Sequence, residues 1–156
     1  MADNGTLPGC EVIISSDSHV MEPPETLVNR APAGFKDQVP RFPQLKVGDS
    51  FQAQPGGSDP SKRITEMETD GVSAEVLFPT YLLPHFAMDD AKLQEVSFHA
   101  YNDWVVDYCK PYPSRLFAAA VVPMQSVPFA VDEMHRAASM GLRAICIRPN
   151  FVGEFP

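Results

Sequence analysis

Apolar and polar residues fall into blocks along the chain, and the shortest apolar blocks predict strands. Four such blocks, rich in β-branched residues, occupy residues 11–17, 74–78, 116–122 and 143–148. Each is mostly apolar on both faces, as expected of strands in a parallel sheet that helices cover. Pro79, Pro123 and Pro149 directly follow three of the blocks. Proline favours a strand end because it has no N–H for the sheet ladder.

The segments between the predicted strands have helical spacing and recognisable ends. Three helices are predicted: one from Asp59 to a stop at Asp70-Gly71, one from Asp89-Asp90 to Tyr108, and one from Ser126 to a cap at Gly141. Asp59 and Ser126 are N-cap residue types, and each is followed by a proline in the first turn. The order β, loop, α, β, α, β, α, β predicts an α/β fold with a parallel sheet, either an open doubly wound sheet or part of a (β/α)₈ barrel.

The segment 25–57 interrupts this alternation. It is rich in proline, glycine and glutamine and has little periodicity. We therefore expect a long insertion loop after the first strand, and such loops in compact domains are usually functional or mobile. The 156 residues suit one domain, 1–156, whereas a complete barrel takes roughly 200 residues or more. The expectation is an incomplete barrel with four parallel strands.

Charge and cysteine content narrow the class of partner. The net charge is −8, and no cluster of Lys and Arg offers a surface that tracks phosphates, so nucleic acid is not an expected partner. An acidic surface disfavours anionic membranes, and no apolar stretch is long enough to span a bilayer. Cys10, Cys109 and Cys146 are far apart and odd in number, which favours neither a disulfide framework nor a thiolate zinc site. We expect a cytoplasmic protein that acts on a small-molecule substrate.

Asp17, His19 and Glu22 stand at the carboxyl end of the first predicted strand. Catalytic residues collect at the carboxyl ends of parallel strands. Asp17 and His19 are two residues apart in an extended stretch, so their side chains leave the same face and can reach one ion together. Imidazole with carboxylate suits Zn²⁺ best, and also Mn²⁺ or Fe²⁺. The alternative is a strand-end turn, in which Asp17 bonds to nearby backbone and His19 is a partly buried ring.

Four stretches of sequence carry a family resemblance: Ser16 to Pro24, Asn102 to Cys109, Tyr112 to Phe117 and Met140 to Asn150. Together they resemble the amidohydrolase-related family, in the branch that contains aminocarboxymuconate-semialdehyde decarboxylase and the resorcylate-type decarboxylases. The resemblance implies a (β/α)₈ barrel with one divalent ion, of which this chain would be the N-terminal half. The family's usual first-strand motif is His-x-His; Asp17 stands in its first position, and His19 matches the second ligand. The family's later ligands, a histidine after the fifth strand and an aspartate after the eighth, have no positions in this chain.

Further polar residues follow the predicted strands. Glu22 has no secure counterpart in the family, and it could bind the ion, orient the neighbouring histidine or cap a turn. Tyr81 and His85 could shape a pocket for an aromatic or carboxylate substrate; for His85 the alternative is a turn with surface aromatic residues. Arg148 and Asn150 close the fourth strand. Arg148 could clamp a substrate carboxylate through two hydrogen bonds or form a structural ion pair.

The resemblance is compatible with two reactions. In a hydrolase the ion activates water, and in a non-oxidative decarboxylase it holds substrate oxygens and stabilises developing charge. Asp17 in the first ligand position favours decarboxylation. The rival hypothesis is a non-catalytic half barrel, a scaffold or self-association module, because two exposed apolar sheet edges invite pairing into a homo-oligomer. The sequence has no Gly-x-Gly-x-x-Gly after the first strand and no Gly-x-Ser-x-Gly elbow, which argues against a dinucleotide site and a serine hydrolase.

Overall fold

Four parallel strands form the sheet of the computed structural model, which describes residues 12–44 and 54–148. The strands are β1 (Ile14–His19), β2 (Ala74–Phe78), β3 (Leu116–Val121) and β4 (Ala144–Cys146), hydrogen-bonded in the order β1-β2-β3-β4. All three neighbouring pairs are parallel. Spatial order thus equals sequence order, as in a barrel wall, whereas the order of a doubly wound sheet reverses at a switch point. The predicted α/β class, with four parallel strands and intervening helices, is confirmed.

Capping residues fix the ends of the three long helices, α2 (Pro60–Asp70), α3 (Ala91–Cys109) and α4 (Val127–Ser139). Asp59, Asp90 and Ser126 precede them, and each side chain accepts a hydrogen bond from a backbone N–H of the first turn. Gly71 and Gly141 follow α2 and α4 with φ angles of 73° and 96°, which residues with a Cβ rarely adopt. None of the helices in the described part of the chain is long and apolar enough to cross a membrane.

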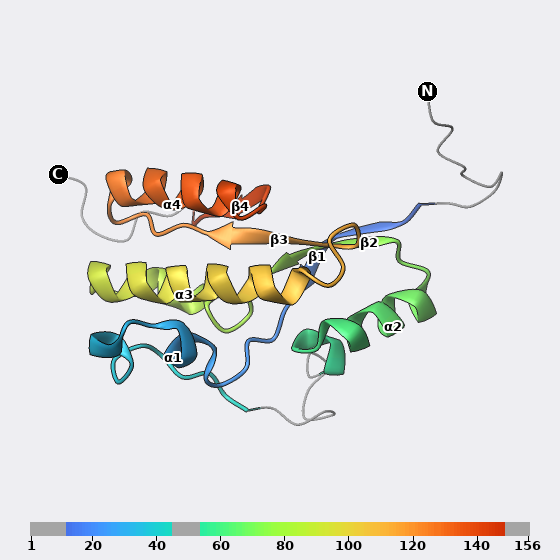
Figure 1. Ribbon diagram of the computed structural model, residues 1–156, viewed down its shortest axis with the longest axis horizontal. Coiled ribbons are helices and arrows are strands. Elements are labelled where there is room, and N and C mark those ends of the chain that lie inside the picture. The colour runs from blue at the N-terminus through green and yellow to red at the C-terminus, as the bar shows by residue number, and fades with distance from the viewer. Residues whose placement is uncertain (1–11, 45–53, 149–156) are drawn as a thin grey trace.

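Helix α3 contributes the largest share of the core. Its Phe98, Tyr101 and Val105 are fully buried, and each such side chain stabilises the fold by about 1.5–3 kcal/mol relative to an exposed one. The helix packs on β3, whose small residues 118–120 allow a close approach. Figure 1 shows α3 running alongside β3, with α1 beside α3. The helical layer therefore covers one side of the sheet at its centre.

The segment 25–57 contains regular structure where the sequence predicts a loop. It holds α1 (Thr26–Arg30) and the 3₁₀ turns η1 (Ala33–Phe35) and η2 (Pro55–Gly57); residues 45–53 lie outside the described part. Helix α1 is only five residues long, too short for helical periodicity to be visible in the sequence. Leu27, Val39 and Phe42 are buried. The described part of this segment therefore packs onto the core.

Several strand boundaries differ from the sequence prediction: β1 begins at Ile14 rather than at residue 11, and β3 ends at Val121 rather than at residue 122. β1 extends to His19, beyond the predicted end at residue 17, because the register with β2 shifts and keeps His19 paired with Phe78. β4 is shorter than the predicted run 143–148, because only residues 119–121 of β3 pair with it. The later end of β1 and the short β4 arise from pairing between strands, which the pattern of one strand does not contain.

Candidate functional site

A bulge near the end of β1 sets the direction of the candidate ligands. Ser15 pairs with Glu75 and Ser18 with Leu77, so β1 has one residue more than β2 between these pairs. The hydroxyl oxygens of Ser15 and Ser18 are 2.8 Å apart and share a hydrogen bond across the extra residue. Bulges bend a strand and re-aim the side chains that follow. Asp17 lies within this bulge.

The imidazole of His19 is held in one tautomer. Its Nδ1 is 2.8 Å from the main-chain oxygen of Pro79, and since a carbonyl only accepts, Nδ1 carries the proton. In the neutral ring Nε2 then keeps its lone pair, as in the histidine ligands of metal sites. The Asp17 Oδ1 atom is 3.7 Å from Nε2, and the side chains are 41% exposed for His19 and 89% for Asp17. The structure therefore brings two donor atoms together where an ion can reach them.

Glu22 is buried, with 1% of its surface exposed. Its two carboxylate oxygens accept hydrogen bonds from the backbone N–H groups of Thr80, Tyr81 and Leu82, at 3.0–3.2 Å. Burial raises the pKa of the Glu22 carboxyl, and the N–H donors oppose that rise. Of the three roles considered for Glu22, these contacts match the cap of a turn. Across residues 12–44 and 54–148, no three His, Cys, Asp or Glu side chains come together as a metal site.

Arg63 of α2 was not predicted from the sequence, yet it contacts the candidate site. It is 8% exposed. Its guanidinium donates to the main-chain oxygen of His19, to the Gly56 oxygen at 3.0 Å and the Tyr108 hydroxyl at 2.8 Å, and to the Glu75 carboxylate at 2.6 Å. One clue was present in the sequence, since Arg63 lies four residues before the core residue Met67 and thus on the buried face of α2.

A hollow of about 490 Å³ adjoins these residues. Its lining includes His19, Met21, Gly57, Arg63, Glu66 and Thr80. Met21 reaches it because its N–H donates to the Gly57 oxygen at 2.7 Å. The site is therefore accessible from the side on which η2 and α2 lie.

Tyr81 and His85 pack around Phe42, a residue of the 25–57 segment. The Tyr81 ring stacks on Phe42 at 5.8 Å between centroids, and the His85 ring meets it edge-on at 5.9 Å. His85 Nδ1 donates to the Tyr81 main-chain oxygen at 3.0 Å. The Tyr81 hydroxyl is buried without a hydrogen-bond partner among the described residues, and burial, with a smaller contribution from the nearby Glu22 charge, raises its pKa. Tyr81 and Glu22 both line a second hollow of about 280 Å³.

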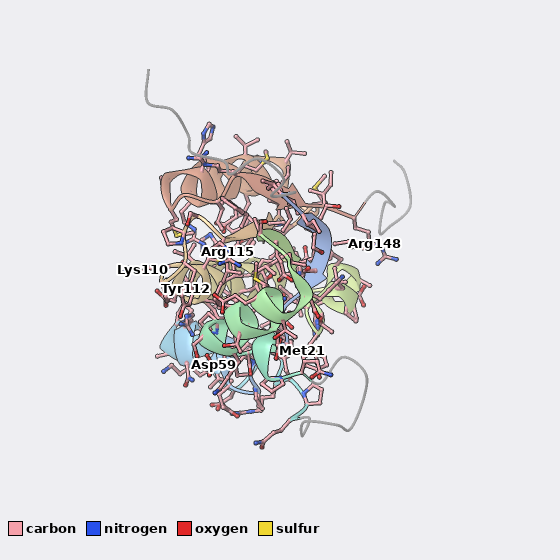
Figure 2. All side chains as sticks on the ribbon, turned by 90° about the vertical axis from the view of Figure 1, so that its right-hand side faces the viewer. Met21, Asp59, Lys110, Tyr112, Arg115 and Arg148 are labelled. Atoms are coloured by element: carbon pink, nitrogen blue, oxygen red, sulfur yellow. The ribbon has the colours of Figure 1, made fainter. Side chains whose placement is uncertain are left out.

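Arg148, which follows β4, lies away from the candidate site. Arg148 is exposed, and Figure 2 shows it at the rim of the molecule, apart from Met21. Asn150 lies outside the described residues. The structure thus joins Asp17 with His19 and Glu22 with Tyr81, while the roles of Arg148 and Asn150 in substrate binding stay predictions.

A comparison with protein families decides the family. The amidohydrolase family model matches residues 16–156. The chain belongs to the amidohydrolase family. A comparison of the chain with curated proteins finds no match.

Solved structures agree with the fold. An amidohydrolase from Mycobacterium avium subsp. paratuberculosis superposes with a TM-score of 0.65 at 16% identity, over 84% of this chain and 48% of that one. 2,6-Dihydroxybenzoate decarboxylase from Rhizobium gives 0.58 at 20% identity, over 86% and 38%. 5-Carboxyvanillate decarboxylase from Novosphingobium aromaticivorans, solved with bound manganese, gives 0.60 at 20% identity, over 86% and 41%. The chain therefore spans less than half the length of these three proteins and shares the fold of that part.

Proposed function

We propose that this chain is a metal-dependent enzyme that acts on a small carboxylated ring, with decarboxylation preferred over hydrolysis. The observation that carries the proposal is the state of His19, whose Nδ1 proton is held by Pro79 while Nε2 faces outward near Asp17. Asp17 and His19 would be two donors to the ion. Further donors would have to come from water, substrate or other protein groups, since a divalent ion takes four to six ligands.

The donor set fits a borderline ion such as Zn²⁺, Mn²⁺ or Fe²⁺. When bound, such an ion acts as a Lewis acid that stabilises negative charge on oxygen. The preference for decarboxylation rests on Asp17 in the first ligand position and on the similarity to enzymes named as decarboxylases. Zn²⁺ as the preferred ion and a cytoplasmic location rest on the sequence alone.

Other residues of the chain would fix the turn near the two donors and form the substrate pocket. Glu22 holds the backbone N–H groups of residues 80–82 and so fixes the turn that carries Tyr81. Tyr81 and His85, packed on Phe42, would form an aromatic wall for a ring substrate. Arg148 and Asn150, which follow β4 in the sequence, would hold the substrate carboxylate, a role that suits the two-pronged guanidinium of Arg148.

Ion binding tests the proposal. Chelator-treated protein is titrated with Zn²⁺, Mn²⁺ or Fe²⁺ in turn, and we expect one ion per chain. Asp17→Ala and His19→Ala should each abolish stoichiometric binding, whereas His135→Ala, which changes an exposed histidine of α4, should not. Release of CO₂ from 2,6-dihydroxybenzoate and 5-carboxyvanillate then tests the reaction. Absence of stoichiometric binding of any of the three ions would reject the enzyme proposal for this chain.

A scaffold or self-association role is the second candidate. Ile14 of the edge strand β1 and Ile145 of the edge strand β4 are exposed, and unpaired apolar edges promote association. Sedimentation at several protein concentrations distinguishes the two. A defined oligomer that binds no ion supports the scaffold, and a species that binds one ion per chain supports the enzyme.

A further inference from the structure

The peptide unit that follows His19 is hydrogen-bonded at both ends. Its carbonyl oxygen, on His19, accepts from Arg63. Its N–H, on Val20, donates to the Phe78 oxygen at 2.9 Å. A peptide unit is planar, so two bonds on opposite edges fix its orientation and the position of the His19 Cα. The pairing of Ser18 with Leu77 and of His19 with Phe78 then sets the Cα–Cβ direction of His19. The ring is fixed separately, through Nδ1 and the Pro79 oxygen at 2.8 Å.

The guanidinium of Arg63 is itself held in place. Glu75 of β2 lies 2.6 Å away and is largely buried, with the ion pair's two side chains 10% and 12% exposed. Gly56 and Tyr108 supply two more oxygen acceptors on the Nε side. Arginine presents its N–H groups in a rigid planar fork, so acceptors on several elements define one position for it. Arg63 thus ties α2, α3, β2 and η2 to the end of β1.

We propose that Arg63 is a positioning residue that aims His19 Nε2 at the ion. With the main chain of His19 fixed by Arg63 and the ring by Pro79, Nε2 has one direction, towards Asp17. If the main-chain bond is lost, the end of β1 shifts and the ring leaves the Pro79 oxygen. The effect on ion affinity rests on the proposed function; the effect on the His19 ring does not.

A merely structural role would lower stability without changing His19, and Arg115 provides the matched control. Arg115 also donates to two main-chain oxygens, those of Val72 and Ser73. These residues precede β2, at the end of the sheet away from His19, and Figure 2 shows Arg115 apart from Met21. Arg115→Met therefore removes two arginine-to-main-chain hydrogen bonds from the other end of the strands.

The test uses ¹⁵N-labelled histidine in the full chain and long-range ¹H–¹⁵N spectra of the ring nitrogens. Wild type should show His19 protonated at Nδ1 only. Arg63→Lys keeps the positive charge beside Glu75 but loses the fork, and Arg63→Met with Glu75→Gln removes both charges, so that no buried carboxylate is left unpaired. Both variants should show His19 exchanging between tautomers, with Zn²⁺ affinity lowered by about 10- to 100-fold, as for residues that orient metal ligands.

His85 serves as an internal control, because its Nδ1 also donates to a main-chain oxygen but in a separate turn. Its tautomer should be unchanged in every variant, as should that of His19 in Arg115→Met. The proposal is overturned if both Arg63 variants keep the wild-type His19 tautomer or the wild-type ion affinity. If wild type binds no ion, the proposed function fails, and the His19 tautomer alone decides whether Arg63 positions the ring.

Discussion

Glu22 and Glu133 are both carboxylates with 1% of their surface exposed, but their surroundings differ. Glu22, beside the candidate site, accepts only neutral backbone N–H groups among the residues that the structure describes. Glu133, between α3 and α4, pairs with Arg136 and His99 and accepts from the Asn102 amide. Burial raises the pKa of Glu22 and is only opposed by its donors. For Glu133 the hydrogen bonds of Arg136, His99 and Asn102 outweigh burial and lower the pKa to about 2.

The comparison teaches that a buried charge does not by itself mark a functional site. The cluster around Glu133 fastens helices to the sheet: Asn102 exchanges two hydrogen bonds of 2.9 Å with Val121 of β3. Within the described residues, none of that cluster's hydrogen bonds reaches Asp17 or His19. In contrast, Arg63 donates to the main-chain oxygen of His19. Glu22 accepts from the backbone of the turn that follows Pro79, the residue that holds the His19 ring. What a buried charge contacts decides its role.

The largest loss of stability is expected from disrupting the cluster of Glu133, Arg136, His99 and Asn102. Asn102→Ala leaves the N–H and C=O of Val121 without their partner, which costs about 1–3 kcal/mol for each buried group. The free energy of unfolding should fall by about 3 kcal/mol in urea denaturation. Ion affinity of the folded fraction and the His19 tautomer should be unchanged. A change in either would show that the two regions are coupled.

Gly56→Ala should disrupt the contacts of Arg63 near His19, with a smaller loss of stability. A Cβ at Gly56 would lie 2.7 Å from the Arg63 Cα and 2.1 Å from a Glu66 oxygen. Because the Arg63 contact is with backbone, overpacking should cost about 1–3 kcal/mol and move the guanidinium. The His19 tautomer should change as in the Arg63 variants. Gly34→Ala, with nothing within 4 Å of its Cβ, is the control that should change neither property.

Glu22→Gln separates the roles of Glu22. If Glu22 caps the turn of residues 80–82, the isosteric amide keeps part of the acceptor set, and stability should fall by about 1–2 kcal/mol. Zn²⁺ affinity should then change by less than about threefold, a difference below 1 kcal/mol. A loss of stoichiometric ion binding in calorimetry, with the fold intact, would instead make Glu22 a ligand.

The smallest and most diagnostic effect is the pH dependence of stability. The pKa of Glu133 is lowered from 4.5 to about 2, so its contribution is present above pH 4.5 and is lost as pH falls towards 2. The pKa of Glu22 is raised above 4.5, so its ionisation reduces stability as pH rises beyond that value. Urea denaturation from pH 2 to 7 should show a shallower acid loss in Glu133→Gln. In Glu22→Gln the decline in the free energy of unfolding above pH 4.5 should disappear. If both variants give the same pH profile, the opposite pKa shifts of Glu22 and Glu133 are wrong.

Much of the fold could be predicted from sequence, because its determinants are local. β2 has the predicted bounds, since Pro79 ends it, and Ser126 with Pro128 marks the start of α4. The five-residue helix α1 has too few turns for a periodic pattern. The later end of β1 depends on pairing with β2.

The candidate site was only partly predictable, because its contacts join distant positions. The spacing of Asp17 and His19 predicts that their side chains lie close together, and in the structure Oδ1 and Nε2 are 3.7 Å apart; their role as metal ligands stays a prediction. The partners of Glu22 are 58 to 60 residues further along the chain, and Arg63 is 44 residues from His19. No local pattern encodes such separations, so only the folded chain identifies what these buried charges hold.

The most direct test of the central claim is a Zn²⁺ titration followed at the ring nitrogens of ¹⁵N-labelled histidine. The prediction is that His19 Nε2 shifts with one equivalent of Zn²⁺ while Nδ1 stays protonated. Asp17→Ala should remove that shift. If His19 Nε2 is unchanged at stoichiometric Zn²⁺, or if His85, His99 or His135 responds in its place, His19 is not the donor and the proposed metal site is wrong.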